Sequence, residues 1–515
     1  MAVTAAVFSK REAILLASAA MTVAFGLTVL LSRVITLDDS YITYRYARHL
    51  AEGYGFGAWN HVGEHVEGYS SPLWTVLLAG AASLGVDVLT ASKVFGAAAV
   101  LAAMAVLFRR RDDRPAVLTG VFLALYFPFI FYAASGMEAV AFTSLVASAL
   151  AGPASWQPIV APLLVAMRPE GALVAAVDVL ALAWRRERRQ LVVGTAGAAG
   201  LIFVAIAVHR WFAYGALAPN TYYAKVAGGG LGHVWLGLVY VGSWMLANVV
   251  VVAFVVVGAL AAKRTRDPRM QTCLALFVAY ILYMVSAGGD PPSAFPMWRQ
   301  FIHIAPAWAL VAMTGLVSVV RDRRWRQVAV VIALALASNV GMLLVQGRGG
   351  PRPGVLVFVE WLSSISSPET TISSSYGGGL PYMVDAVHID ALGLSTPYIA
   401  RHGTFDPDGP QDSKTDMRWV MDQRPDIVEG YLSGLALLRG ASPDEIIGPR
   451  RRKMILEMLS SPRFQREYVF VRNAPYESMD RAVFLRRDYW ETHPRRGELD
   501  CVPVAETALA QVFGR

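Results

Sequence analysis

Residues 37–74 read LDDSYITYRYARHLAEGYGFGAWNHVGEHVEGYSSPLW, and they follow an apolar segment that is long enough to cross a membrane. Two adjacent carboxylates, Asp38 and Asp39, stand at the end of that segment. Charged side chains are costly at the mouth of a transmembrane helix unless they face water, a partner or a substrate. Aromatic residues, arginines and a further carboxylate, Glu67, crowd the rest of the stretch. The stretch therefore predicts a site built into a loop, and not a simple tether between helices.

The composition of the chain is that of a membrane protein. Of its 515 residues, 55% are hydrophobic and 16% are charged, and the mean hydropathy is +0.44. Soluble proteins carry roughly 25% charged residues, and several runs here reach the roughly 18–20 apolar residues that span a bilayer. The formal net charge is +8, but the basic residues form short clusters between apolar runs. This pattern indicates membrane topology, so the lipid bilayer is an expected partner and nucleic acid is not.

Four clusters of basic residues determine the expected topology. The positive-inside rule places all four in the cytoplasm, together with Lys10 and Arg11. After the chain leaves the cytoplasm near residues 12–35, it must therefore return by Arg109 through an odd number of further crossings. The clusters are Arg109, Arg110, Arg111 and Arg114; Arg185, Arg186, Arg188 and Arg189; Lys263, Arg264, Arg266 and Arg269; and Arg321, Arg323, Arg324 and Arg326.

The segment 72–86 is expected to be a juxtamembrane or re-entrant helix, because it is short and a second crossing there would break the parity. The predicted fold is an α-helical polytopic membrane protein with about eleven transmembrane helices, a cytoplasmic N-terminus and an outer C-terminus. Loop 36–87 is its large first outer loop. Two expected crossings are short, so the count can change by two without altering sidedness. The expected crossings lie near residues 12–35, 88–108, 115–133, 138–152, 156–167, 170–184, 191–212, 236–262, 270–287, 301–320 and 326–346.

The composition changes at about Gly347, after which no run is long enough to span a membrane. The remaining stretch of about 170 residues is sufficient for one soluble domain. Strand-like runs at Tyr468–Val471 and Ala482–Leu485 and a helix-like run at Met454–Leu459 predict an α+β fold. The expected organisation is a transmembrane domain over 1–346 and an extracytoplasmic domain over 347–515.

With this topology, the polar motifs of the outer face come from several separate helix ends. Irregular polar backbone at a membrane boundary predicts a cavity that lines a site. The motifs are Asp38–Asp39 and Glu67; Ser135–Glu138; Arg168–Glu170; Pro219–Lys225; Gly288–Asp290; and Trp298–Gln300, with His303 at the head of the next helix.

Each carboxylate motif also has a structural interpretation. Asp38 and Asp39 suit the N-terminus of a helix over 40–52, although a single Asp would serve as its cap. Glu138 is better explained as the cap of the helix that begins there than as a catalytic group. Asp290, beside two glycines and two prolines, can be turn chemistry alone.

The cationic and aromatic candidates also have structural interpretations. Arg168 and Glu170 fit an interfacial ion pair as well as they fit a site. Lys225 fits a lysine that snorkels to the interface. The tyrosines that include Tyr41 are, taken alone, typical of an interfacial aromatic belt.

Other chemistries find no support in the sequence. It contains no Walker A loop, no Rossmann glycine fingerprint, no HExxH and no CxxC. These motifs hold nucleotides and metals, so no cofactor and no metal is expected. The GYSSP run at 68–72 does not match the GxSxG nucleophile elbow.

Seven groups of motifs, taken in chain order, resemble the GT-C superfamily of polytopic glycosyltransferases. Over roughly residues 30–405, the series is most similar to the terminal β-(1→2)-arabinofuranosyltransferase family of the mycobacterial cell wall and its wider bacterial relatives, some of which carry a flagellar motor control label. The motifs are LDDSYITYRYARHLAEGYG, HVEGYSSPLW, ASGMEAVAFTSL, MRPEGALVA, APNTYYAKV, SAGGD followed by WRQFIHIAP, and IDALGLSTPYIARHG.

The resemblance implies a GT-C type bundle with juxtamembrane helices in its first outer loop and a C-terminal extracytoplasmic domain. It also implies a donor sugar carried on a polyprenyl phosphate and presented on the outer leaflet. The expected catalytic acid lies at the end of the first helix, which is Asp38 or Asp39 here. The chain departs from the LGLxDPYIA pattern of relatives at Ser395 and Thr396, which leaves the acceptor open.

Glycosyl transfer needs a base for the acceptor hydroxyl and charge compensation on the leaving phosphate. Asp38 or Asp39 can be the base, or can stabilise oxocarbenium character at the sugar. No metal is required if cations compensate the phosphate. The donor-phosphate candidates are Arg168, Lys225, Arg299 and His303, and the sugar or acceptor candidates are Tyr41, Arg45, Glu67, Tyr69, Trp74, Glu138, Glu170, Asn220, Tyr222, Tyr223 and Asp290.

The predicted function is transfer of a sugar, arabinofuranose by resemblance, from a polyprenyl-phosphate donor to a glycan acceptor of the cell envelope. The reaction is expected on the outer face of the cytoplasmic membrane. The alternative is a lipid-linked sugar transporter, or a flagellar-motor or envelope assembly factor without catalysis. A transporter is expected to carry inverted repeats and broken helices near the bilayer midplane, and the sequence shows no such repeat.

Overall fold

The computed structural model describes residues 8–290, 298–320, 324–346, 355–406, 414–430, 432–447 and 452–512. The chain forms two compact units, each assembled from three stretches of sequence. The first comprises residues 1–40, 71–209 and 230–349, and the second comprises residues 41–70, 210–229 and 350–515. Two loop segments from the N-terminal half therefore group with the C-terminal part. The linear boundary expected between residues 346 and 347 stays a prediction.

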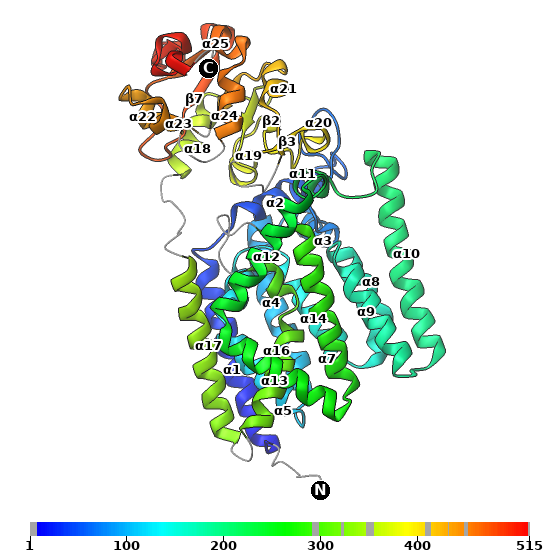
Figure 1. The fold of residues 1–515 in the computed structure, drawn as a ribbon. Helices are drawn as coiled ribbons and strands as arrows, with labels where there is room; N and C mark the ends of the chain where they lie inside the picture. The colour runs from blue at the N-terminus through cyan, green and yellow to red at the C-terminus, as the bar shows by residue number, and fades with distance from the viewer. Residues whose placement is uncertain are drawn as a thin grey trace. The chain divides into compact units, whose positions relative to one another are not determined.

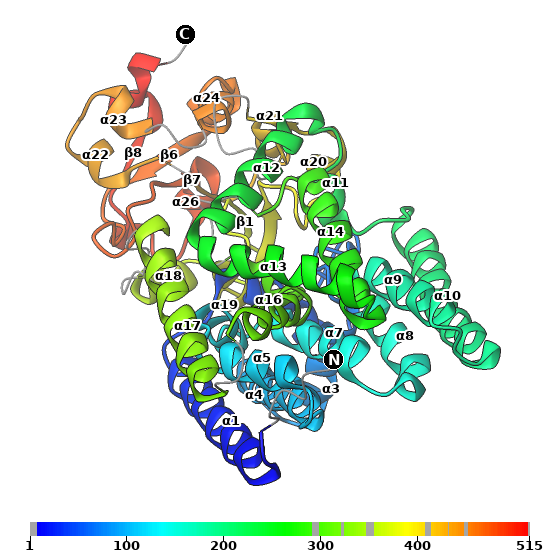
Figure 2. The same ribbon diagram turned by 60° about the horizontal axis from the view of Figure 1, so that its bottom comes forward.

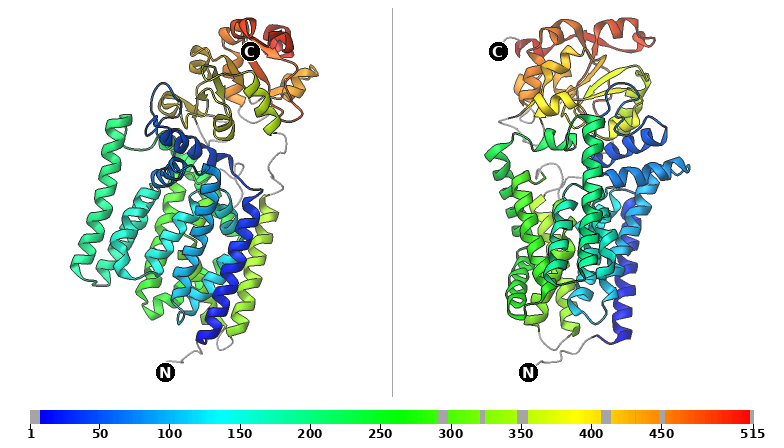
Figure 3. Two further views of the ribbon diagram at one scale, coloured as in Figure 1. Left: turned by 180° about the vertical axis from the view of Figure 1, so that it is seen from behind. Right: turned by 90° about the vertical axis from the view of Figure 1, so that its right-hand side faces the viewer.

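The first unit is helical throughout its described residues, and Figure 3 shows its long helices side by side. Helices α2 (Asp38–Ala51) and α10 (Arg189–Tyr214) begin in this unit and continue into the second. The other helices of the first unit are α1 (Lys10–Ser32), α3 (Pro72–Ser83), α4 (Val88–Arg109), α5 (Arg114–Leu125), α6 (Phe127–Ala134), α7 (Ala139–Ala151), η1 (Ala154–Trp156), α8 (Gln157–Met167), α9 (Gly171–Trp184), α12 (Gly230–Ala247), α13 (Val249–Thr265), α14 (Pro268–Ala287), α15 (Arg299–His303), α16 (Ala305–Val319) and α17 (Arg324–Gln346).

Among the described residues, five helices are long and apolar enough to cross a membrane, namely α1, α4, α10, α12 and α14. A sixth span results if the bent pair α5 and α6 is counted as one. Several further apolar helices are shorter, so the expected number of about eleven spans stays a prediction. The segment expected to be juxtamembrane or re-entrant forms α3, whose 12 residues extend about 18 Å, less than the hydrocarbon core of a bilayer.

Two expected crossings are interrupted. The crossing expected at 115–133 bends by 62° between α5 and α6, where Pro128 has no backbone N–H to donate. The backbone N–H of Phe127, at the break, donates to the side-chain oxygen Oδ1 of Asn339 at 2.9 Å. The crossing expected at 236–262 is broken at Asn248, whose side-chain amide donates to the carbonyl of Trp244 at 3.0 Å. Such local side-chain bonds compete with the regular helical ladder.

Helices α13 and α16 pack with their backbones almost in contact. A Cβ on Gly258 would lie 1.9 Å from the carbonyl oxygen of Val311, and one on Gly315 would lie 2.1 Å from that of Phe254. Small residues at such crossings let transmembrane helices approach closely. The two glycines therefore determine the distance between these helices.

The second unit is built around a mixed six-stranded sheet in the order β2-β1-β5-β7-β6-β8, of which Figure 1 labels β2 and β7. Strands β2, β1 and β5 are parallel, whereas β5, β7, β6 and β8 pair antiparallel. The predicted α+β character of this region is thus present in its strands and helices. The strands are β1 (Thr371–Ser374), β2 (Val387–Asp390), β3 (Thr404–Phe405), β4 (Lys414–Thr415), β5 (Ile427–Glu429), β6 (Tyr468–Val471), β7 (Val483–Arg486) and β8 (Cys501–Pro503).

Short helices surround this sheet and its loops. Their amphipathic faces bury a core that includes Phe358, Ile427, Phe464 and Phe484. The helices are α11 (Asn220–Lys225), α18 (Val355–Ser364), α19 (Gly379–Met383), α20 (Pro397–His402), α21 (Met417–Asp422), α22 (Gly434–Leu438), α23 (Pro443–Ile447), α24 (Arg452–Leu459), α25 (Pro462–Glu467), α26 (Arg487–Thr492), η2 (Arg496–Glu498), η3 (Val504–Glu506) and η4 (Ala508–Val512).

A smaller apolar cluster joins the three sequence stretches of the second unit. Tyr46 and Tyr69 from residues 41–70 pack edge to face, with ring centroids 4.9 Å apart. Ala224 of α11 and Leu394 and Ala400 of the C-terminal part belong to the same buried cluster. Burial of these apolar side chains explains why the two loop segments fold with the C-terminal part.

Candidate functional site

The predicted catalytic carboxylates lie at the start of α2. Asp38 and Asp39 occupy the first turn of the helix, where its dipole stabilises negative charge. The backbone N–H of Leu37 donates to the carbonyl of Ser135 at 3.3 Å, and Ser40 Oγ donates to the same oxygen at 3.0 Å. The serine of the ASGME motif therefore fixes the position of the helix end that carries both carboxylates.

Arg299 brings Asp39 and Asp290 together in the first unit. Its Nη2 and Nε donate to the two oxygens of Asp290, at 2.7 and 3.2 Å, and its Nη1 donates to Asp39 Oδ2 at 3.3 Å. The side chains of Arg299, Asp290 and Asp39 are 14%, 15% and 27% exposed. Burial lowers the pKa of Arg299, but the two carboxylates outweigh it and hold that pKa well above its ordinary value. The cluster pairs one permanent cation with two carboxylates.

The backbone around Arg299 has an unusual conformation. Trp298, which immediately precedes α15, has φ of +44°, in the left-handed region, where a bulky residue is strained. Its indole Nε1 donates to Ser243 Oγ at 2.7 Å. Phe301 stacks on Trp244 with ring centroids 3.9 Å apart and an interplanar angle of 5°. These contacts hold the short helix that presents Arg299.

A second, largely buried ionic network surrounds Arg168. Its Nε donates to Glu170 Oε1 at 2.6 Å and its Nη1 pairs with Glu138. Glu170 also lies 3.3 Å from His303 Nδ1, which is 2.9 Å from the hydroxyl of Tyr280. Burial lowers the pKa of Arg168, but Glu170 and Glu138 raise it above its ordinary value. Arg168 is thus committed to two carboxylates.

This network revises the structural interpretation of two motifs. Glu138 occupies the N-cap position of α7 but makes no capping hydrogen bond with its side chain. Its carboxylate pairs with Arg168 instead. Arg168 and Glu170 form the ion pair that the sequence allowed, and the pair is buried.

The helix α15 belongs to both ionic groups. Arg299 opens this five-residue helix and His303 ends it, so the two side chains lie one turn apart on the same face. His303 is fully buried, and its Nε2 has no hydrogen-bond partner among the described residues. A displacement of α15 would therefore disturb both groups at once.

Glu67 forms the principal ion pair of the second unit. Arg210 donates to both of its carboxylate oxygens, from Nε at 2.5 Å and from Nη2 at 2.8 Å. The backbone N–H of Asn220 donates to the carbonyl of Glu67 at 3.0 Å. The amide of Asn220 donates to the carbonyls of Gly393 and Leu394, each at 2.8 Å. These bonds connect the motifs HVEGYSSPLW, APNTYYAKV and IDALGLSTPYIARHG.

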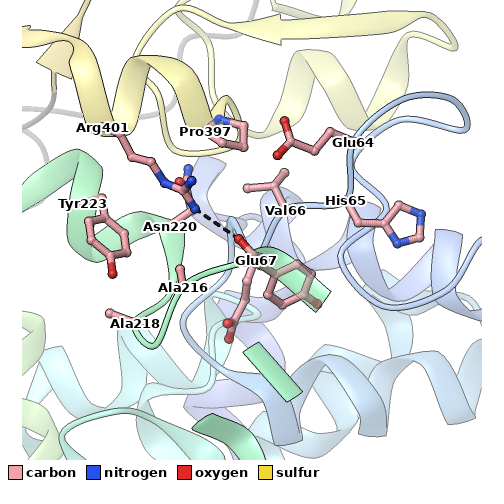
Figure 4. A pocket seen from close by; sticks show the side chains of 11 residues that line it. Glu64, His65, Val66, Glu67, Ala216, Ala218, Asn220, Tyr223, Pro397 and Arg401 are labelled. Atoms are coloured by element: carbon pink, nitrogen blue, oxygen red, sulfur yellow. Dashed lines mark hydrogen bonds between the residues drawn. The ribbon is translucent and has the colours of Figure 1, made fainter. Parts of the chain in front are cut away.

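A polar pocket lies beside this pair, and Figure 4 shows its lining. Arg401 Nη2 donates to the carbonyl of Tyr214 at 3.1 Å, and its guanidinium lies 5.8 Å from the ring centroid of Tyr223. The pocket thus combines carboxylates, an amide, a cation and aromatic faces, which are the groups that bind sugar hydroxyls and ring faces. Its lining comprises Glu64, His65, Val66, Glu67, Tyr214, Ala216, Ala218, Asn220, Tyr223, Pro397 and Arg401.

Asp390 organises the turn that closes one side of this region. Its carboxylate accepts from the backbone N–H groups of Leu392 at 2.9 Å and Ser395 at 2.8 Å. Burial raises the pKa of Asp390, while these backbone bonds and Lys225 oppose the shift. The turn places Ser395 Oγ 3.3 Å from the hydroxyl of Tyr46. The departure from the relatives' pattern at Ser395 is thus a packed hydrogen-bonding position.

Arg45 has the contacts of a structural residue. Its guanidinium donates to the backbone carbonyls of Trp59 at 2.6 Å and Ala386 at 3.1 Å, and also to that of Pro381. Tyr41 packs against the ring of Tyr382, with centroids 5.3 Å apart. Acceptor binding by these residues stays a prediction.

Three other candidates lie outside the pocket lining and outside both ionic groups. In the first unit, Trp74 Nε1 donates to the carbonyl of Gly136 at 3.3 Å. In the second unit, Tyr69 is buried, and Tyr222 is 46% exposed outside the pocket lining. Their predicted roles remain untested.

Sequence reasoning missed Arg210 and Tyr280 as partners of predicted site residues. Arg210 carries a recognisable signal, since it is a cation at the end of a long apolar run. Tyr280 lies inside an apolar helix and gives no such signal. Across the described ranges, no group of three or more His, Cys, Asp or Glu side chains is arranged to hold a metal ion.

No protein-family model matches the chain, and no curated protein matches its sequence. Among solved structures, it is similar to ArnT from Cupriavidus metallidurans bound to undecaprenyl phosphate, with a TM-score of 0.55 and 11% identity over 98% of this chain and 100% of that one. The apo state of the same ArnT has a TM-score of 0.49 at 13% identity, over 98% of each chain. Arabinofuranosyltransferase AftD from Mycobacteria has a TM-score of 0.39 at 13% identity, over 93% of this chain and 40% of that one. The chain therefore has a fold similar to that of ArnT.

Proposed function

We propose that the chain is a membrane glycosyltransferase that moves a sugar from a polyprenyl-phosphate donor to a glycan acceptor. The observation that carries this proposal is the contact between Asp39 and Arg299, which joins a partly exposed carboxylate to a fixed cation at the start of α2. The fold supports it, because the similar ArnT structure is bound to undecaprenyl phosphate. A shared fold alone does not assign a reaction, so the proposal rests on the site residues.

In the proposed reaction, the bond between the anomeric carbon and the donor phosphate oxygen breaks, and a bond from that carbon to an acceptor hydroxyl oxygen forms. The hydroxyl proton passes to the carboxylate of Asp39. Polyprenyl phosphate leaves with the electron pair of the broken bond. Asp39 suits the base because its side chain is 27% exposed and makes one long contact to Arg299, which leaves oxygen lone pairs for a substrate.

Arg299 is the proposed main cation for the leaving phosphate. Its guanidinium is permanently charged, and charge-assisted contacts to phosphate are strong. Lys225 and His303 remain candidates for the same role. Arg168 is less suited to it, because two buried carboxylates already neutralise its charge. We assign Arg168, Glu138 and Glu170 the role of holding α15, and with it Arg299, in place.

The residues around Glu67, Asn220 and Tyr223 are proposed to form part of the surface that contacts sugar or acceptor groups. Glu64, an exposed carboxylate of the lining, can accept hydrogen bonds from hydroxyls, and the Tyr223 ring offers an apolar face. The finer assignments rest on the sequence resemblance. They are an arabinofuranose donor, a cell-envelope acceptor, and a site on the outer face of the cytoplasmic membrane.

The alternative is a lipid-linked sugar transporter or a non-catalytic assembly factor. The bent pair α5 and α6 is the observation that favours transport, since broken helices are typical of transporters. The ion pair of Asp39 with Arg299 favours catalysis instead, because a transporter needs no base.

The two functions are separated by one reconstitution. The full chain in liposomes receives synthetic polyprenyl-phosphoryl arabinose, and both glycosyl transfer to an added arabinan acceptor and lipid translocation between leaflets are measured. The proposal predicts acceptor-dependent release of polyprenyl phosphate, which is strongly reduced in Asp39→Asn. Translocation without transfer would establish the transporter. Transfer from a hexose-linked donor but not from the arabinose donor would retain the enzyme and overturn the sugar assignment.

A further inference from the structure

The first unit contains a groove between α1 and α4. The groove lies near the start of α1, whereas the proposed catalytic group, Asp39, follows the end of α1. The groove is open, has a volume of about 450 Å³ and lies at the end of the bundle where α1 begins and α4 ends. Figure 2 shows these two helices side by side at that end. None of its lining residues belongs to either ionic group described above. They are Ile14, Ala17, Ser18, Met21, Ala105, Val106, Phe108, Arg109, Arg111 and Trp156.

The wall of the groove is apolar, and small residues make it hollow. Ile14, Ala17, Ser18 and Met21 recur at the spacing of one face of α1. Ala105 of α4 lies opposite, where a larger side chain would fill the space. In a helix that is apolar enough to cross a membrane, such a surface takes hydrocarbon chains, because water does not reach it.

The mouth of the groove is cationic. Arg109 ends α4 and Arg111 follows it, and both side chains are exposed. The guanidinium of Arg109 lies 5.4 Å from the ring centroid of Trp156, which is 38% exposed. Tryptophan is enriched at membrane interfaces, and cation–π contact with an exposed ring restrains an arginine without neutralising it. A mouth of this composition is typical of head-group depth.

Two nearby carboxylates, Asp113 and Glu12, are already engaged by other groups. Asp113 pairs with Arg269 and accepts from the backbone N–H of Ala116. Glu12 caps the start of α1 by accepting from the backbone N–H of Ser9 at 2.8 Å. The charge that Arg109 and Arg111 present to the groove is thus not cancelled by either carboxylate.

We propose that this groove binds an anionic phospholipid of the surrounding bilayer, with its phosphate on Arg109 and Arg111 and one acyl chain between α1 and α4. Basic pockets between transmembrane helices are the recognised type of site for anionic head groups. The bound lipid fills the hollow and holds α1 against α4. The proposal is independent of the transferase function, since it uses no residue of that site.

The test is native mass spectrometry of the full chain with palmitoyl-oleoyl phosphatidylglycerol, and with phosphatidylcholine of the same chains as the neutral comparison. The double variant Arg109→Gln/Arg111→Gln should weaken retention of phosphatidylglycerol by about 30-fold, from two lost cationic contacts. The matched control is Arg188→Gln/Arg189→Gln, which removes the same charge from exposed residues of another basic cluster and should retain the lipid.

A second variant tests the groove without touching its charge. Ala105→Leu should reduce binding of phosphatidylglycerol because the added side chain occupies the path of the acyl chain, and inorganic phosphate should not displace the lipid. Equal retention of phosphatidylcholine and phosphatidylglycerol would overturn the proposal, as would equal loss in both arginine double variants. Displacement by millimolar inorganic phosphate would also overturn it, since the site would then recognise the phosphate alone.

Discussion

Arg299 binds Asp290 through two hydrogen bonds, at 2.7 and 3.2 Å, and reaches Asp39 through a single one at 3.3 Å. The bidentate bond fixes the guanidinium in orientation, which a single contact does not. Asp290 is therefore the residue that positions Arg299. Asp39 is more exposed and has more unused acceptor capacity, which distinguishes it from Asp290 as the candidate base.

Replacement of Arg299 should weaken donor binding. Arg299→Ala removes a charge-assisted contact to phosphate, which is worth roughly 1.5–3 kcal/mol. Arg299→Lys keeps the charge but loses the fork that Asp290 orients, so its effect should be intermediate. Titration of the purified variants with polyprenyl phosphate measures this directly, with Arg401→Ala as the arginine control outside the ionic group. Wild-type affinity in Arg299→Ala would remove this residue from the phosphate site.

The buried network should govern the stability of the first unit. Arg168→Met leaves Glu138 and Glu170 buried without their cation, and breaking a buried pair in this way costs about 3–5 kcal/mol. The matched control is Arg463→Met, since the pair of Arg463 with Asp422 is 42% and 66% exposed. Thermal melts in detergent should show a large drop in Tm for the first variant and no measurable shift for the control. Equal Tm values would mean that the network does not hold the fold.

The Tyr223 ring should affect acceptor binding and not donor binding. Tyr223 lines the pocket and packs near Arg401, so Tyr223→Ala should raise the KM for acceptor by about 5- to 30-fold, the loss expected for an aromatic contact to a sugar face. Its control is Tyr54→Ala, at an exposed ring of the same unit. Steady-state kinetics at saturating donor gives both values. A rise in the donor KM alone would place the acceptor elsewhere.

Acidification should destabilise the second unit through two buried histidines. Burial lowers the pKa of His49 to about 4, and it lowers the pKa of His388 well below its ordinary value. Both are neutral when folded but titrate near 6.5 when unfolded. Their stability contribution is therefore present above about pH 6.5 and is lost as the pH falls toward the folded pKa, with a slope of at most about 1.4 kcal/mol per pH unit for each group.

Chemical unfolding of the wild type and of His49→Gln and His388→Gln between pH 8 and 4.5 measures this slope. His388 Nε2 lies 3.0 Å from the carbonyl of Val384, which glutamine can still approach as a donor. Each variant should flatten the pH dependence of the free energy of unfolding. An unchanged slope in both variants would show that other groups cause the acid sensitivity.

The local sequence was sufficient to predict those elements that depend on neighbouring residues. Pro72 and the short apolar run after it predicted the helix that the structure has at Pro72–Ser83. The helix expected over 40–52 is present as α2, with Asp38 and Asp39 in its first turn. The fold type followed from the order of the motifs. In each case a length, a cap or a motif near the residue itself carried the information.

Long-range pairings could not be predicted in this way. Glu67 and Arg210 are 143 residues apart, and no spacing rule connects them. The break at Asn248 depends on whether its amide bonds Trp244 or faces a neighbour, which is a matter of tertiary packing. The pairing of Arg168 with two carboxylates could likewise not be predicted, because Glu138, considered alone, also suited a helix cap.

The central claim is that Asp39 is the catalytic base, and single-turnover transfer from polyprenyl-phosphoryl arabinose tests it most directly. Asp39→Asn should lower the transfer rate by about 10²- to 10⁴-fold, as expected for loss of a general base, while donor binding changes little. Asp38→Asn, the adjacent carboxylate in the same helical turn, should stay within a few-fold of wild type. A near-wild-type rate in Asp39→Asn, or a loss confined to Asp38→Asn, would contradict the assignment.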